Sequence, residues 1–327
     1  TLCRRELSQK NQEVLFIMMK QIKRAIRYQL DKGNRRFVIY PFGETGMKVK
    51  DVLNQQFGIT EKYAADSELC RYHSEIKSVA ELEEDYKSDD FIILLSIEPL
   101  SPNSGIVHRQ ITKFASLDRI VDIFSISTYF IPENYYEPIQ LNRDIRKSTL
   151  ECISREIYKN GIKGAVAEAG VYKGNTAKYI NALFPDRKLY LFDTFHGFDQ
   201  RDQRYDDDSE IHNLKLDFSD TSVEMVLEKM IWIQNVIIRK GWFPDSAKGV
   251  NDEFCCVRLD MDLYQPTKSG LEFFYPRMIH GGYICVHDCR SRNFDGARKA
   301  VEEFCKKYSL NYMNMPDDLG TAVIPVG

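Results

Sequence analysis

Hydrophobic residues near the N-terminus recur at spacings of three and four positions. The series comprises Leu15, Met18, Met19, Ile22, Ile26 and Leu30, with lysines and arginines between its members. This period predicts an amphipathic helix over residues 5–31, with Gly33 as a stop signal just beyond it. The helix is a candidate interface with the following domain or with another subunit of a homo-oligomer.

Short apolar runs alternate with helical patterns in the remainder of the first half. Strands are predicted at 37–40, 62–65 and 91–97, with helices after the first strand and at 80–86. This alternation is typical of βαβ units and therefore of a parallel sheet with helices on its faces. A turn with Gly43 and Gly46 comes after the first strand, and Asp66 after the second. Because the turn lacks the full glycine spacing of dinucleotide-binding domains, we favour close helix packing over phosphate binding as its role.

The second half repeats this alternation without copying the first. Residues 128–142 carry prolines among tyrosines and predict a linker. A helix follows at 141–160, and strands are predicted at 164–168, 189–192, 235–239, 255–259 and 282–286. We therefore divide the chain into an N-terminal helix (1–34), a small Rossmann-like, nucleotide-binding-like α/β domain (35–130) and a second α/β domain (131–327).

Composition limits the classes of partner. The 327 residues include 45 Lys and Arg against 48 Asp and Glu, a formal net charge of −3. A near-neutral chain has no electrostatic excess for nucleic acid or anionic membranes. The longest apolar runs are far shorter than the roughly 20 residues of a membrane helix. Eight scattered cysteines without a CxxC pair indicate reduced thiols, and with no recognisable secretory signal we expect a cytoplasmic protein.

A glycine turn opens the second domain and is a candidate ligand site. Glu168 ends the first strand, and Gly170 and Gly174 lead into a helix whose N-terminal amides would face a ligand. Asp193 ends the next strand, where a carboxylate accepts both hydroxyls of a ribose. The alternative for Asp193 is a helix cap before Thr194.

Two further segments come after strands at the same edge. The third strand is followed by Gly241, Trp242 and Phe243. The rings of Trp242 and Phe243 either stack on a purine or fill the core. Residues 200–222 are rich in aspartate and glutamate. We interpret this segment as a lid over bound ligands, with a solvated surface loop as the alternative.

Four ionisable residues come after the fourth and fifth strands of the second domain. Asp260 and Asp262 come after the fourth strand, and His287 and Asp288 after the fifth. Neighbouring parallel strands bring such groups together at one sheet edge. Their mutual repulsion favours a divalent cation among them, and a hydrogen-bonded structural cluster is the alternative.

These motifs together resemble the macrocin O-methyltransferase family, over residues 141–327. The resemblance implies a class I methyltransferase fold for the domain at 131–327 and S-adenosylmethionine as the cofactor. It places Glu168, Gly170 and Gly174 beside the methionine part of the cofactor and Asp193 at its ribose. It also places Asp260, His287 and Asp288 at a metal, for which we expect Mg²⁺. The complete predicted cofactor-binding set is Glu168, Gly170, Tyr172, Gly174, Asp193, Thr194, Gly241 and Trp242.

The resemblance also implies an activity, methylation of a sugar hydroxyl in a polysaccharide, a lipid-linked glycan or a glycosylated metabolite. A bound metal would lower the pKa of that hydroxyl, and Asp260 or His287 would accept its proton. The chain departs from the family at His287–Asp288, where two consecutive acids are common, so His287 is either a ligand or a base. His196 is a further candidate base, although a lone histidine in a turn is more often structural.

Two other functions fit parts of the pattern. A nicotinamide-dependent oxidoreductase could use either glycine turn, but it leaves the acids and the histidine after the fourth and fifth strands unexplained. A non-enzymatic scaffold in glycan assembly would retain the fold with an inactive cofactor site. The role of the N-terminal domain stays open.

Overall fold

A computed structural model describes residues 2–98, 101–132, 144–203, 218–290 and 295–327, with side chains from Val14 onward. The chain divides into two compact units, Thr1–Pro138 and Ile139–Gly327. Of the linker expected at 128–142, residues 133–142 lie outside the described residues. Among the described residues, no helix is both long enough and apolar enough to cross a lipid bilayer.

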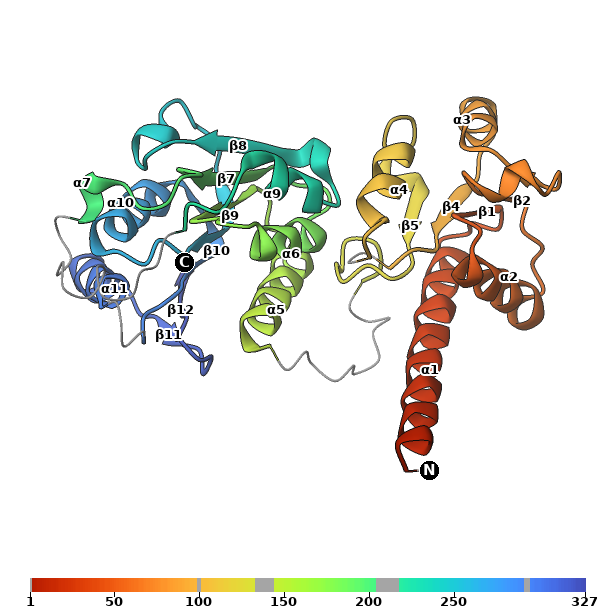
Figure 1. Ribbon diagram of the computed structural model, residues 1–327, viewed down its shortest axis with the longest axis horizontal. Coiled ribbons are helices and arrows are strands. Elements are labelled where there is room, and N and C mark those ends of the chain that lie inside the picture. The colour runs from red at the N-terminus through yellow and green to blue at the C-terminus, as the bar shows by residue number, and fades with distance from the viewer. Residues whose placement is uncertain (1, 99–100, 133–143, 204–217, 291–294) are drawn as a thin grey trace. The chain divides into compact units, whose positions relative to one another are not determined.

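The first unit contains a five-stranded parallel sheet (Figure 1). Its strands, in the spatial order β3-β2-β1-β4-β5, are Ile76–Lys77, Tyr63–Ala65, Phe37–Tyr40, Ile92–Leu95 and Ile120–Asp122. Both β1 and β4 are buried along their whole length, as their continuous apolar sequences indicate. The chain therefore forms the Rossmann-like unit that the alternating pattern predicts.

Helices surround the first sheet. They are α1 (Leu2–Asp31), α2 (Glu44–Phe57), α3 (Val79–Ser88) and α4 (Ser104–Ile111), with 3₁₀ turns at Leu69–Arg71 and Leu117–Arg119. The C-terminal half of α1 buries Ile22, Ala25 and Ile26 and contacts α2. At Gly46 a Cβ atom would meet the carbonyl oxygen of Pro41 at 2.7 Å. This glycine therefore allows α2 to approach the chain just after β1, which supports the packing interpretation of the turn.

The second unit contains a seven-stranded sheet in the order β11-β12-β10-β9-β6-β7-β8. In chain order its strands are β6 (Ala165–Ala169), β7 (Leu189–Asp193), β8 (Val236–Lys240), β9 (Phe254–Leu259), β10 (Met278–Val286), β11 (Met313–Asn314) and β12 (Ala322–Val326). The first five run parallel, and β12 is antiparallel to β10. The order reverses between β6 and β9, and such a switch point opens a crevice at the carboxyl ends of the strands.

Helices cover both faces of the second sheet (Figure 1). They are α5 (Ile145–Lys159), α6 (Asn175–Leu183), α7 (Gln200–Gln203), α9 (Val223–Lys229), α10 (Tyr264–Phe274) and α11 (Gly296–Tyr308), with 3₁₀ turns at Ile233–Asn235, Asp245–Ala247 and Tyr275–Arg277. The core on the side of α10 is aromatic: Phe243 packs against Phe192 and Phe274, with ring centroids 5.6 and 5.9 Å apart. Of the two aromatic residues after β8, Phe243 therefore belongs to the core.

Candidate functional site

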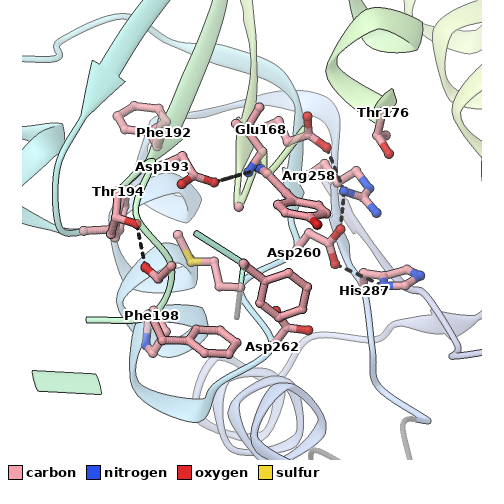
Figure 2. Close-up of a pocket in the computed structure, with 18 of the residues that line it drawn as sticks. Glu168, Thr176, Phe192, Asp193, Thr194, Phe198, Arg258, Asp260, Asp262 and His287 are labelled. Atoms are coloured by element: carbon pink, nitrogen blue, oxygen red, sulfur yellow. Dashed lines mark hydrogen bonds and ion pairs between the residues drawn. The ribbon is translucent and has the colours of Figure 1, made fainter. Parts of the chain in front are cut away.

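A cavity of about 470 Å³ opens at the carboxyl ends of the second sheet. Its wall takes residues from the ends of all five parallel strands, among them Glu168 on β6, Asp193 on β7, Trp242 after β8, Asp260 after β9 and His287 after β10. Figure 2 shows four of these side chains, those of Glu168, Asp193, Asp260 and His287, around the cavity. The volume lies within the range of cofactor sites. The switch point of the sheet thus gathers predicted site residues around one space.

Gly170 and Gly174 shape the turn between β6 and α6. Gly170 has φ of +84°, and a Cβ there would lie 1.8 Å from the carbonyl oxygen of Asp260. Gly174 has φ of +73° at the N-cap of α6, where a Cβ would press on Val226 at 3.0 Å. The close approach of the segment after β9 thus requires glycine at position 170. The sequence pattern instead suggested the approach of a ligand as the reason for this glycine.

Asp193 fastens this turn to β7. Its Oδ2 accepts hydrogen bonds from the backbone N–H of Val171 at 2.7 Å and of Tyr172 at 2.9 Å, and its Oδ1 accepts one from Phe195 at 2.7 Å. No helix begins at Thr194, so the helix-cap alternative does not describe this contact. The Thr194 hydroxyl donates to the carbonyl of Gly197 at 2.6 Å. Two lone pairs on each carboxylate oxygen of Asp193 give four acceptor positions, and the three backbone amides occupy three of them, so one position on Oδ1 remains for a further hydrogen bond.

The described ends of the acidic segment contact two predicted cofactor residues. At one end, the Trp242 indole donates to Oδ2 of Asp202 at 2.9 Å, and the Arg201 guanidinium stacks on its ring at 4.0 Å. At the other end, the Tyr172 hydroxyl donates to Asp220 at 2.6 Å. The lid prediction concerns mainly residues 204–217, which lie outside the described residues.

Arg258 is a buried cation that sequence reasoning did not select. Glu168 on β6 is the register partner of Arg258 on β9, and Asp260 lies two residues further along the same face. One guanidinium nitrogen of Arg258 therefore lies 2.7 Å from both carboxylates (Figure 2). Burial raises the pKa of Glu168 to about 8, although the Arg258 charge opposes this shift. The sequence did contain a signal for this ion pair, namely a single Arg within an apolar strand. Buried arginines are almost always paired with an acid, so a partner for Arg258 could have been expected.

Asp260, His287 and Asp288 form a cluster in which one ligand atom from each lies within 4.8 Å of the others. The ladder of β9 and β10 continues past the strands, since the His287 amide donates to the Leu259 carbonyl at 2.8 Å. Nδ1 of His287 is then 3.0 Å from Oδ1 of Asp260 and 3.0 Å from Oδ1 of Asp288. Burial lowers the pKa of His287, but these carboxylates outweigh it and raise the pKa to about 9.

The two aspartates after β9 differ in basicity. Burial favours the neutral form of Asp260, but the charges of Arg258 and His287 outweigh it and hold the pKa of Asp260 well below its usual value. Burial raises the pKa of Asp262, and the neighbouring carboxylates of Asp260 and Asp288 raise it further. Asp262 also has φ of +59°, a conformation uncommon outside glycine, and lines the cavity. Asp262 is therefore the more basic of the two carboxylates.

The match to known families covers this whole region. The model of the macrocin-O-methyltransferase (TylF) family matches residues 142–321, more than half of the chain. The chain belongs to the macrocin-O-methyltransferase family. The chain is accordingly an S-adenosylmethionine-dependent O-methyltransferase. This decides against an oxidoreductase or a scaffold without enzymatic activity.

Two curated proteins are similar to the same part of the chain. An 8-demethyl-8-(2,3-dimethoxy-alpha-L-rhamnosyl)-tetracenomycin-C 4'-O-methyltransferase from Streptomyces olivaceus is 24% identical over 182 residues, 51% of this chain and 67% of that protein. A demethyldecarbamoylnovobiocin O-methyltransferase from Streptomyces niveus is 25% identical over 191 residues, 55% of this chain and 71% of that protein. Among solved structures, the O-methyltransferase NovP aligns with a TM-score of 0.49 and 21% identity, covering 56% of this chain and 79% of NovP.

Within this macrocin-O-methyltransferase domain, the cavity wall collects nearly all of the predicted site residues. It includes the three predicted metal ligands and seven of the eight predicted cofactor residues, namely Glu168, Gly170, Tyr172, Asp193, Thr194, Gly241 and Trp242. The eighth, Gly174, caps α6 between the wall residues Lys173 and Asn175. His196 is exposed in a turn and is not part of the wall. The candidate base at His196 is thus separated from the cluster, whereas Arg258 and Asp262 join it.

Proposed function

We propose that this domain transfers the methyl group of S-adenosylmethionine to a sugar hydroxyl, with a divalent cation at Asp260, His287 and Asp288. One observation carries the proposal: a single cavity joins the glycine turn and Asp193 to the Asp260–His287–Asp288 cluster. A methyl transfer requires the donor and the acceptor hydroxyl to meet in line, and this geometry brings the two half-sites together.

The glycine turn and its neighbours support binding of the cofactor. The remaining lone pair on Oδ1 of Asp193 suits a ribose hydroxyl. The Trp242 ring, held by Asp202 and Arg201, offers a flat surface for adenine. Oε2 of Glu168 is buried in the cavity wall, with no hydrogen-bond partner in the described part of the chain. It is placed to accept a hydrogen bond from the ammonium group of the methionine part.

The donor set supports a divalent cation. Two carboxylates and an imidazole converge, and neither ring nitrogen of His287 has a partner in hydrogen-bonding geometry within the described residues. A divalent cation there would lower the pKa of a sugar hydroxyl bound to it. Support for a sugar acceptor comes from the relative from Streptomyces olivaceus, whose name specifies a rhamnosyl group. We accordingly propose a glycan or a glycosylated metabolite as the acceptor class.

Asp262 is the proton acceptor that the local electrostatics favour over Asp260 and His287. Asp260 shares Arg258 with Glu168 and contacts His287, and these charges make its carboxylate a poor base. Asp262 lines the cavity, and burial, reinforced by the carboxylates of Asp260 and Asp288, raises the pKa of its carboxyl. It would take the hydroxyl proton as the oxygen attacks the methyl group.

Binding of the cofactor tests the first half of the proposal. Isothermal titration calorimetry of the full chain with S-adenosylmethionine should give micromolar binding, weakened about tenfold or more by Asp193→Asn. The amide keeps the volume of the carboxylate, and circular dichroism checks that the fold is retained. Glu272→Gln on α10, outside the cavity wall, is the matched control and should bind as the wild type does. Absence of binding in every condition, with and without Mg²⁺, would refute the methyl-donor site.

Turnover tests the role of Asp262. With an acceptor found by screening glycosides and nucleotide sugars, Asp262→Asn should lower kcat by roughly 100-fold or more, because a general base contributes about that much. The affinity for S-adenosylmethionine should stay unchanged. The measurement is the rate of S-adenosylhomocysteine release, with exposed Asp318→Asn as the control. A wild-type kcat in Asp262→Asn would assign the proton to another group.

A further inference from the structure

The imidazole of His287 is enclosed by three carboxylates rather than two. Nδ1 faces Asp260 and Asp288 at 3.0 Å, and on the opposite side Nε2 faces Oδ2 of Asp317 at 3.8 Å. The side chain of His287 is 4% exposed, and neither nitrogen has a partner in hydrogen-bonding geometry among the described residues. Burying an imidazole without hydrogen-bond partners costs free energy of folding. The carboxylates that face Nδ1 and the carboxylate that faces Nε2 therefore each need an explanation.

Asp317 approaches from outside the cluster. It lies before β12, thirty residues after His287 in the sequence, and its own carboxylate is anchored. The amide and the hydroxyl of Thr321 each donate to it at 2.7 Å. A histidine that binds a metal through one nitrogen commonly presents the N–H of the other to a carboxylate, which sets the ring orientation and the tautomer. Asp317 is in the position of such a partner for Nε2.

We infer that Asp317 orients His287 so that Nδ1, with Asp260 and Asp288, forms a nitrogen–oxygen–oxygen ligand set selective for a first-row transition ion such as Mn²⁺ over Mg²⁺. The inference rests on the proposed function, whose cation it specifies. Carboxylates suit both Mn²⁺ and Mg²⁺, so the imidazole is the ligand that discriminates between them. First-row transition ions accept a nitrogen ligand, whereas Mg²⁺ prefers oxygen ligands and water and tolerates little deviation from octahedral geometry. Mg²⁺, the ion expected from the sequence, then becomes the weaker competitor. Asp317 is a positioning residue, because it acts through His287.

Competition between the two ions tests the selectivity. Mn²⁺ is titrated into the full chain, the free ion is followed by electron paramagnetic resonance, and Mg²⁺ is added as the competitor. The wild type should bind Mn²⁺ at least about tenfold more tightly than Mg²⁺, and His287→Asp should abolish most of this preference. Equal affinities in the wild type, or an unchanged ratio in His287→Asp, would overturn the inference.

A second set of variants tests Asp317. Asp317→Asn should weaken Mn²⁺ binding about 10- to 100-fold, as is typical when the partner of a ligating histidine is lost. Thr321→Val removes one anchor of the same carboxylate but leaves the carboxylate itself, so its Mn²⁺ affinity should stay near that of the wild type. Asp318→Asn controls for the loss of one negative charge at the adjacent, exposed position. If Thr321→Val weakens Mn²⁺ binding as much as Asp317→Asn does, then Asp317 only stabilises the turn between Asp317 and Thr321 and does not orient His287.

A spectroscopic readout separates ligation from folding. Electron spin-echo spectra of bound Mn²⁺ should contain the coupling to an imidazole nitrogen in the wild type and lack it in His287→Asp. Absence of that coupling in the wild type would contradict ligation by His287. S-adenosylmethionine binding is measured on each protein in parallel. Intact cofactor binding without Mn²⁺ preference defeats this inference alone, whereas loss of cofactor binding in the wild type defeats the proposed function.

Discussion

In each unit the first strand is followed by a glycine turn and a helix, yet the acid at the end of the second strand makes different contacts in the two units. In the first unit, Oδ1 of Asp66 accepts hydrogen bonds from the amides of Glu68 and Leu69, within its own turn. In the second unit, Asp193 accepts from amides more than twenty residues earlier in the chain, and so joins two strand ends. An acid at this position thus has a local role in one unit and a long-range role in the other.

The carboxyl edges of the two sheets also differ in charge. In the first unit, the Ser96 hydroxyl donates to the carbonyl of Pro41 and the Tyr40 hydroxyl donates to Gln110, both at 2.5 Å. Asp122, at the end of β5, forms a buried pair with His108 at 3.1 Å. In the second unit, acids and an imidazole crowd together around Arg258. The two edges thus share a glycine turn after a parallel strand but differ in the charged groups that meet there.

The largest effect is expected from Gly170→Ala. A Cβ atom 1.8 Å from the Asp260 carbonyl forces the two strand ends apart, and φ of +84° adds strain. We expect the free energy of unfolding of the second unit to fall by more than about 4 kcal/mol. Gly43→Ala is the matched change in the first unit, where φ is −86° and, apart from the two adjacent residues, no atom of the described part of the chain lies within 4 Å of the added carbon. Chemical denaturation should find that variant close to wild type, and similar losses in both would erase the contrast.

The next effect concerns the buried cation. Arg258→Met leaves the buried Asp260 carboxylate without its guanidinium partner, so we expect a loss of about 3–5 kcal/mol in unfolding free energy. Adding Glu168→Gln should change this loss little near neutral pH, because the carboxyl of Glu168 already holds a proton there. The exposed pair of Arg36 and Asp89 in the first unit is the control, and Arg36→Met should change stability little. Thermal unfolding of the wild type and these three variants provides the measurement.

The smallest effect is a pH dependence traced to Glu168. Its pKa is about 8 in the folded chain against an ordinary value of 4.5, so between these values the folded state holds a proton that the unfolded state has released. Raising the pH from 5 to 8 should therefore cost stability, on the order of 2 kcal/mol relative to Glu168→Gln, which cannot titrate. Calorimetric unfolding of both proteins across this range tests the sign. A difference that grows in favour of the wild type with pH would show that Arg258 keeps Glu168 ionised.

Much of the fold could be predicted because the five parallel strands of the second unit are short apolar runs. The prediction of a strand at 189–192, for example, differs from β7 by one residue. Strands β11 and β12 were not predicted: β11 has two residues, and β12 contains a proline near its end. Helix α4 and strand β5 were missed in the same way, since each is too short for a clear period.

The contacts of the candidate site likewise differ in how far the sequence predicts them. The meeting of Asp260, His287 and Asp288 could be predicted, since these residues come just after two strands and neighbouring strands end at one edge. The pairing of Arg258 with Glu168 depends on the register between β9 and β6, which no local pattern determines. Asp317 is harder still, because only the return of the chain along β12 brings it to His287.

The contact between Gly170 and the Asp260 carbonyl has a consequence for how ligands enter. Gly170 belongs to the turn that would hold the methyl donor, and Asp260 belongs to the segment after β9 that would hold the cation. Because the two segments are in van der Waals contact here, a shift of one is transmitted to the other. Occupancy of the two half-sites should then be linked by a coupling free energy, and by reciprocity each ligand should change the affinity of the other by the same factor. The apparent affinity for the methyl donor would then depend on the concentration of the cation, and the reverse would hold by the same factor.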